Sequence, residues 1–309
     1  MVNLVKNREE VKTVSLIILL TLIWGSTFPP IKIIMNALPP FLVAGSRFLL
    51  ASLFLIPVVL WRGLEIPRRR EELFSIIAFG FVQTTLMYAI FFWGIQHTSG
   101  GRAALLLNTH PFIVATLAHF YLPDDRISKG KVLGLTLGMA GIVFVALDRL
   151  RGGVEGSIIG DLAMVASAAC WAISTILAKR ISRRMDVLIL TTGQMLSGSI
   201  LLLALGLLLE MNRPLEISMV VALSYTYMVL ISTSFAFFLW FYLLEKNAAS
   251  KLSVFLFLIP LFGVISSHLV LREGITLNLA WGVLLIGAGI VLVNRAEGGA
   301  ILEGTVPSE

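Results

Sequence analysis

The residues of this sequence that could do chemistry are few, and most of them lie inside long apolar runs. Arg47 and Lys32 are the two basic side chains within such runs, and no carboxylate lies inside any run. The four histidines are scattered between His97 and His268, and the one cysteine is Cys170. This pattern lacks metal-ligand spacing and a paired acid and base, so we expect no catalytic residue, no metal site and no cofactor.

Arg47 is the most informative of these residues. It lies eight positions after Pro39, which is about 12 Å along a helix at ~1.5 Å per residue. An unpaired charge at that depth costs at least ~2.5–3.5 kcal/mol. We interpret Arg47 as a cavity-facing side chain that binds an anionic group, with snorkelling to the membrane surface as the alternative. Lys32 is nearer to the end of its run and is expected to snorkel.

A second polar group lies in the middle of another run. His110 is close to Asn108 and Pro111, and Gln83 is available in the preceding run. A protonatable side chain at this depth could couple proton movement to another process. The alternative is a neutral, hydrogen-bonded core histidine.

The stretch "WGSTFPPIK" (24–32) places two adjacent prolines in an apolar run. Proline has no N–H, so Pro29 frees the carbonyl of Gly25 and Pro30 frees that of Ser26. Together with Thr27, these groups predict a polar notch that lines a cavity, and a plain kink is the alternative. Two further prolines, Pro111 and Pro260, occupy matched positions and are interpreted as a pair of hinges.

Long apolar runs must position these residues. Of the 309 residues 57% are hydrophobic and 14% are charged, and the mean hydropathy is +0.92. A soluble domain could not cover so much apolar surface, so the sequence predicts an all-α integral membrane protein. Ten runs are long enough to cross a bilayer or nearly so. They are 14–35, 39–61, 73–95, 103–122, 132–147, 162–178, 187–209, 217–244, 252–271 and 275–294.

The basic residues indicate the orientation. With the N-terminus inside, the inner segments hold 17 of the 24 Lys and Arg residues and the outer loops hold 5. Cytoplasmic loops are enriched in Lys and Arg, so both termini are predicted to be cytoplasmic. We therefore interpret the net charge of +6 as a topology signal and expect no nucleic-acid partner.

The two halves of the chain repeat each other. At a shift of 147, Trp24 falls on Trp171, and at 149, Pro111 falls on Pro260. At 148, "AGIV" at 140–143 meets "AGIV" at 288–291. Five runs per half is an odd number, which predicts two inverted five-helix repeats, an arrangement typical of secondary transporters. The expected divisions are 14–147, 160–294 and a flexible cytoplasmic tail, 295–309.

Several motifs resemble one family. They are the tryptophan-small-small motif at 24–26, "PPFLVAGSRFLL" (39–50), "LLLNTHPFIVATLAHFYLPDD" (105–125), "AGIVFVAL" (140–147) and "FLIPLFGVISSHLVLREGIT" (257–276). The sequence resembles the EamA family of the drug/metabolite transporter superfamily over about residues 14–294. The resemblance implies a central cavity, alternating access and metabolite movement, often export of amino acids. The family pattern has glutamate where Asp124 and Asp125 lie and at Glu273; at the membrane edge, these carboxylates are expected to take no part in transport.

The leading hypothesis is therefore a multi-pass secondary transporter of the cell membrane. Its substrate is predicted to be a small metabolite, an amino acid by preference, and proton coupling through His110 is one possibility. A phosphorylated-metabolite exchanger of the same fold is the alternative, and a membrane-embedded lipid enzyme is a distant one. The predicted cavity residues are Trp24, Ser26, Thr27, Arg47, Gln83, Tyr88, Asn108, His110, Trp171 and Trp240. The predicted hinges are Pro29, Pro30, Pro111 and Pro260.

Overall fold

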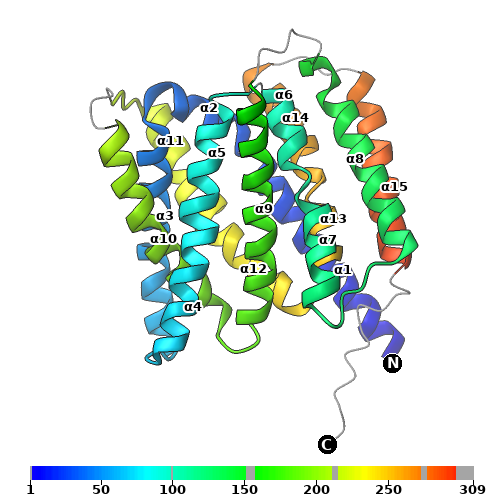
Figure 1. Ribbon diagram of the computed structural model, residues 1–309, viewed down its shortest axis with the longest axis horizontal. Coiled ribbons are helices and arrows are strands. Elements are labelled where there is room, and N and C mark those ends of the chain that lie inside the picture. The colour runs from blue at the N-terminus through cyan, green and yellow to red at the C-terminus, as the bar shows by residue number, and fades with distance from the viewer. Residues whose placement is uncertain (1, 99, 151–156, 211–214, 273–276, 297–309) are drawn as a thin grey trace, which may run out of the picture.

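The computed structural model describes residues 2–98, 100–150, 157–210, 215–272 and 277–296, and these residues form helices without strands (Figure 1). Ten segments within them are long and apolar enough to cross a membrane. The elements are α1 (Val2–Gly25), α2 (Phe28–Ala37), α3 (Pro40–Trp61), α4 (Arg70–Gly80), η1 (Phe81–Leu86), α5 (Met87–Ile95), α6 (Gly100–Leu107), α7 (His110–Tyr121), α8 (Lys129–Leu150), α9 (Ile158–Ile181), α10 (Val187–Glu210), α11 (Met219–Tyr227), η2 (Met228–Phe235), α12 (Ala236–Lys246), α13 (Ala249–Phe255), α14 (Leu258–Leu271) and α15 (Leu277–Ala296).

The ten predicted runs correspond to these ten spans, and several of the spans are longer than predicted. The runs 132–147 and 162–178 become spans Lys129–Leu147 and Ile158–Ile181, because polar residues at their ends continue the helix. Five spans precede residue 150 and five follow it, so the second repeat crosses the membrane in the opposite sense to the first. Residues 297–309 of the predicted tail lie outside the described part of the chain, as does Glu273.

Three spans are broken into two helices, and each second piece has a proline in its first turns. In the first span the break is at Ser26–Thr27, and Pro29 and Pro30 begin α2, where proline fits because the first N–H groups of a helix need no partner. The carbonyl of Gly25, freed as expected, accepts a hydrogen bond from Ser266 Oγ at 3.1 Å. The other two breaks separate α6 from α7 and α13 from α14.

Two other spans contain a π-helical segment, η1 in the third span and η2 in the eighth. Their last residues, Leu86 and Phe235, are 149 positions apart, which is the shift that carries Pro111 onto Pro260, so the two segments occupy equivalent positions in the two repeats. π-Helical segments are rare and are frequently found at functional sites.

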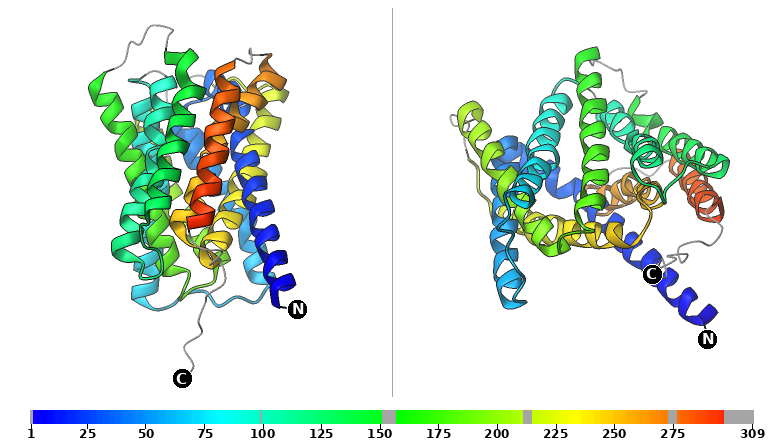
Figure 2. Two further views of the ribbon diagram at one scale, coloured as in Figure 1. Left: turned by 90° about the vertical axis from the view of Figure 1, so that its right-hand side faces the viewer. Right: turned by 60° about the horizontal axis from the view of Figure 1, so that its bottom comes forward.

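The segments 62–69, 122–128, 182–186 and 247–248 join helices at one end of the molecule, which we call the basic end. It is the lower end in Figure 1, where α1 begins and α15 ends. Near this end the interior is filled by aromatic side chains, among them Phe79, Trp240 and Phe241, each at most 1% exposed. The left view of Figure 2 shows the helices running side by side between the two ends.

The two repeats are joined at one side by α8 and α15, which meet backbone to backbone. A Cβ atom on Gly134 would lie 2.6 Å from the carbonyl oxygen of Gly289, and one on Gly141 would lie 2.9 Å from that of Gly282. Any side chain at these positions would force the helices apart, so glycine permits the close approach.

Candidate functional site

A cavity of ≈ 280 Å³ lies between the two repeats. Trp24, Gln83 and Trp171, near the middle of their spans, line it, as do Pro40 and Ala103 at helix ends opposite the basic end. The cavity thus reaches from mid-membrane to the end opposite the basic end. Its volume is slightly below the range typical of drug-sized ligands and suits a smaller metabolite.

Eight of the ten predicted cavity residues line this space, although their contact with a ligand stays a prediction. They are Trp24, Thr27, Arg47, Gln83, Tyr88, Asn108, His110 and Trp171. Ser26 is not among the lining residues of the described chain; its hydroxyl lies 2.5 Å from the Tyr227 hydroxyl and donates to the carbonyl of Ile23. Trp240 belongs to the core, because it is only 1% exposed.

Arg47 is the only Lys, Arg, Asp or Glu among the described residues that line the cavity. It is 6% exposed, and its guanidinium carbon lies 4.8 Å from the ring centroid of Phe48 and 5.4 Å from that of Tyr88. Both rings offer cation–π contacts. Its Nε atom is buried and has no hydrogen-bond partner. The charge is therefore held by aromatic faces and is not neutralised by a carboxylate of the lining.

His110 begins α7 and is stacked on Trp171, with ring centroids 4.3 Å apart and an interplanar angle of 5°. Its Nδ1 lies 3.2 Å from the carbonyl oxygen of Leu107, and its buried Nε2 has no partner. This arrangement suits a neutral imidazole that donates from Nδ1, because an imidazolium would need a second acceptor.

The floor of the cavity is aromatic. Trp24 donates from Nε1 to the carbonyl of Ser232 at 3.2 Å, which fixes its ring. Its ring centroid lies 5.9 Å from that of Trp171, 5.5 Å from Phe237 and 6.0 Å from Trp240, at the tilted or edge-on angles that aromatic pairs prefer. These rings separate the cavity from the basic end.

The predicted hinge prolines lie around this floor. Pro260 lines the cavity, and Pro29 and Pro111 are buried beside the breaks in their spans. Pro30 is half-buried. Their positions fit breaks in the helices, and movement at these breaks stays a prediction.

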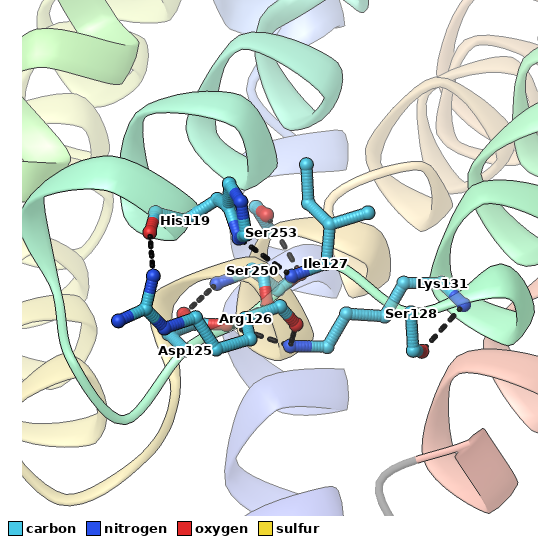
Figure 3. A network of polar contacts seen from close by, with 8 residues as sticks. All are labelled: His119, Asp125, Arg126, Ile127, Ser128, Lys131, Ser250 and Ser253. Carbon is cyan, nitrogen blue, oxygen red and sulfur yellow. Dashed lines mark hydrogen bonds and ion pairs between the residues drawn. The ribbon is translucent and has the colours of Figure 1, made fainter.

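The basic end is closed by a polar network that the sequence did not reveal (Figure 3). Asp125, only 3% exposed, accepts hydrogen bonds from Lys131 Nζ at 2.7 Å, from the Ser250 N–H at 2.9 Å and from the Ser250 hydroxyl. It therefore ties the segment before α8 in the first repeat to the start of α13 in the second. Asp124 does lie at the exposed edge, and its side chain is 83% exposed.

A second contact between elements closes the same end. Lys179 of α9 donates from Nζ to the carbonyls of Leu244, Glu245 and Asn247 at 2.6–2.9 Å. These are the last carbonyls of α12 and the residue after it, which have no partner within the helix. Lys179 thus caps α12 from α9.

Sequence reasoning missed some of the lining. Ser232 and Met228 come from η2, and Gly263 and Val264 come from α14. The repeat offset of 149 carries Gln83 onto Ser232, so the sequence contained a signal for that position.

The comparisons with known proteins agree with this geometry. The sequence matches the EamA-like transporter family over residues 11–147 and again over 158–295. A crystal structure with 20% sequence identity superposes with a TM-score of 0.82, over 93% of this chain and 98% of that one, which shows a shared fold.

Curated relatives align over almost the whole chain. An uncharacterized transporter of Archaeoglobus fulgidus is 31% identical over 93% of this chain and 98% of its own. The uncharacterized transporter YoaV of Bacillus subtilis is 27% identical, over 91% and 96%. A protein described as a probable amino-acid metabolite efflux pump in Salmonella typhimurium is 26% identical, over 90% and 93%. With ten membrane-spanning helices and two matched repeats, this chain belongs to the EamA-like transporter family.

Proposed function

We propose that this chain is a secondary transporter that exports a small carboxylate-bearing metabolite, an amino acid by preference, across the cytoplasmic membrane by alternating access. Both termini then lie in the cytoplasm, because the basic end holds most of the Lys and Arg residues. The cavity faces the outside in the present state. The name of the Salmonella relative supports both the substrate class and the direction.

The observation that carries the proposal is the solitary charge of Arg47 in the cavity lining. A guanidinium recognises a carboxylate through two parallel N–H···O bonds, and in a site shielded from water this contact is strong. The ammonium of an amino acid meets no carboxylate among the described lining residues. It would instead rest against aromatic faces, which Trp24, Trp171 and Phe237 supply.

The alternatives have less support. A phosphorylated metabolite would prefer several basic groups, and the described lining offers Arg47 alone. A lipid enzyme would need a catalytic or metal constellation, and the described residues include no group of three or more His, Cys, Asp or Glu that could hold a metal ion.

Proton coupling through His110 is retained as a second proposal about the same site. Its stacking on Trp171 and its unpartnered Nε2 place a titratable group at the cavity wall. Counterflow in proteoliposomes measured between pH 5 and pH 8 tests it. A pH dependence that is identical in the parent protein and in His110→Gln would refute it.

Arg47→Gln tests the substrate site. The change keeps a polar side chain but removes the charge and the fork of donors. The ligand is an amino acid identified by counterflow against a panel. Losing one charge-assisted contact costs about 1.5–3 kcal/mol, which weakens the apparent affinity for this ligand about ten- to a hundred-fold. The amidated analogue, which has no carboxylate, is expected to lose much less.

Lys32→Gln is the matched control, because Lys32 is an exposed basic residue of α2 that does not line the cavity. It is expected to leave affinity unchanged. Lower thermal stability of Arg47→Gln with equal losses for both ligands would show a structural role. Binding by Arg47→Gln that equals that of the parent protein would refute the proposal.

A further inference from the structure

The π-helical segments η1 and η2 present a polar triplet at equivalent positions of the two repeats. The triplet is Gln83, Thr84 and Thr85 in η1, and a shift of 149 carries it onto Ser232, Thr233 and Ser234 in η2. Each segment contacts the long helix of the opposite repeat: η1 lies against α10, and η2 lies against α3. The helices α10 and α3 are themselves equivalent, at a shift of 147.

In the first of these contacts, two threonines bind α10. Thr84 Oγ1 donates to Gln194 Oε1 at 2.6 Å, and Thr85 Oγ1 donates to the carbonyl of Gly198 at 2.8 Å. The two acceptors are one helical turn apart, so both hydroxyls hold η1 on the same face of α10.

In the second contact only one of these hydrogen bonds has a counterpart, and it is a longer approach. The hydroxyl of Ser234, equivalent to Thr85, lies 3.5 Å from the carbonyl oxygen of Ala51, equivalent to Gly198, and donates to the carbonyl of Val229 at 2.8 Å. The residue equivalent to Gln194 is Arg47, and the residue equivalent to Thr84 is Thr233.

Arg47 and Thr233 make no such bond in this state. Arg47 Nε and Thr233 Oγ1 are both buried and both without a hydrogen-bond partner. Buried polar groups that lack partners cost free energy and call for an explanation. Here a donor and an acceptor are left over at the very positions where the other repeat makes a hydrogen bond.

We propose that Thr233 accepts a hydrogen bond from Arg47 Nε in the state open to the basic end, in which Thr84 releases Gln194. The inference rests on the proposed alternating access. When two inverted repeats with the same fold exchange conformations, the cavity changes sides, and every contact found in only one repeat passes to its equivalent in the other. Thr233 is then a positioning residue that holds the substrate-binding guanidinium in the second state.

Two isosteric substitutions are expected to act in opposite directions. Thr84→Val removes a bond of the present state and shifts the equilibrium toward the state open to the basic end. Thr233→Val removes a bond of that other state and shifts the equilibrium back. A typical net hydrogen bond corresponds to a change of about 2- to 12-fold in the equilibrium constant in each case.

A cysteine at position 253 reports the other state. Ser253 is fully buried here, and it is equivalent at a shift of 149 to Ala104, which lines the present cavity. In a Cys170→Ser background, which has no natural thiol, Ser253→Cys is labelled by a maleimide in detergent at a rate proportional to the population of the other state. Thr84→Val should raise that rate and Thr233→Val should lower it.

Thr84→Ser and Thr233→Ser are the matched controls, because they keep the hydroxyl, and they should show the labelling rate of the parent protein. If Thr84→Val does not fold, Thr233→Val decides alone, since its hydroxyl has no partner to lose here.

Labelling rates that change in the same direction in both valine variants would overturn the proposal, and so would unchanged rates in both. The labelling uses no substrate, so its result is independent of the substrate class. If no carboxylate is transported in counterflow, the proposed function is refuted. Opposite changes of the labelling rate in the two valine variants would still support the exchange of hydrogen bonds.

Discussion

Replacing Asp125 by asparagine should destabilise this protein far more than the same change at its neighbour Asp124. The side chains of Asp125 and Lys131 are 3% and 5% exposed, whereas those of Asp124 and Arg183 are 83% and 51% exposed. Asp125→Asn removes the carboxylate that Lys131 Nζ contacts at 2.7 Å, and breaking a buried ion pair costs about 3–5 kcal/mol. Asp124→Asn breaks an exposed pair worth about 0–1 kcal/mol.

The one natural thiol provides the assay. Cys170 is 8% exposed, so a thiol-reactive dye that becomes fluorescent on coupling will report unfolding in detergent as the temperature rises. Asp125→Asn should lower the apparent melting temperature clearly, and Asp124→Asn should leave it within error of the parent protein. The double variant Asp125→Asn/Lys131→Met should recover part of the loss, because it also removes the buried charge of Lys131. Equal melting temperatures for the two single variants would refute the reasoning.

Three further predictions use other parts of the fold. Gly289→Ala should cost about 1–3 kcal/mol through overpacking, whereas Gly287→Ala, whose Cβ meets nothing within 4 Å, should be neutral or slightly stabilising; the dye assay compares them. Pro29→Ala/Pro30→Ala should fold yet show slower counterflow, because a continuous first span would lose its break; unchanged kinetics would contradict this. A reporter fused after Glu309 should give the signal of a cytoplasmic location, and a signal from the outer side would contradict the proposed orientation.

The fold was largely predictable because bilayer physics leaves few options for long apolar runs. Each run had to become a helix, and most runs were long enough to cross the bilayer. The odd number of runs in each repeat then predicted that the two repeats are inverted. The breaks beside Pro29, Pro111 and Pro260 follow from the chemistry of proline. Runs such as 132–147 and 162–178 were predicted too short, because they ended at charged or polar residues and helices continue through such residues at a membrane surface.

Site residues were predictable only where the depth of a polar residue within its apolar run pointed to a cavity. Arg47 and His110 stand out as polar groups in apolar runs, and both line the cavity. Trp240 has the same chemistry as Trp171, and sequence cannot say which of two mid-span tryptophans faces the cavity. Asp125 appeared to be an edge residue like Asp124, because its partner Ser250 is 125 positions away. The repeat offset can indicate which residues make equivalent contacts, but only after a contact has been seen in one repeat and transferred to the other.

The glycine contact between α8 and α15 also bears on how a two-repeat chain can arise. The repeat shift of 148 makes Gly134 equivalent to Gly282 and Gly141 equivalent to Gly289. The approach of Gly134 to Gly289 and that of Gly141 to Gly282 are therefore the same contact made twice, as across the twofold axis of a homodimer. A single five-helix chain that inserted in both orientations would already possess this surface and its complement. Fusion of two such genes would then join subunits whose interface existed before the linker did.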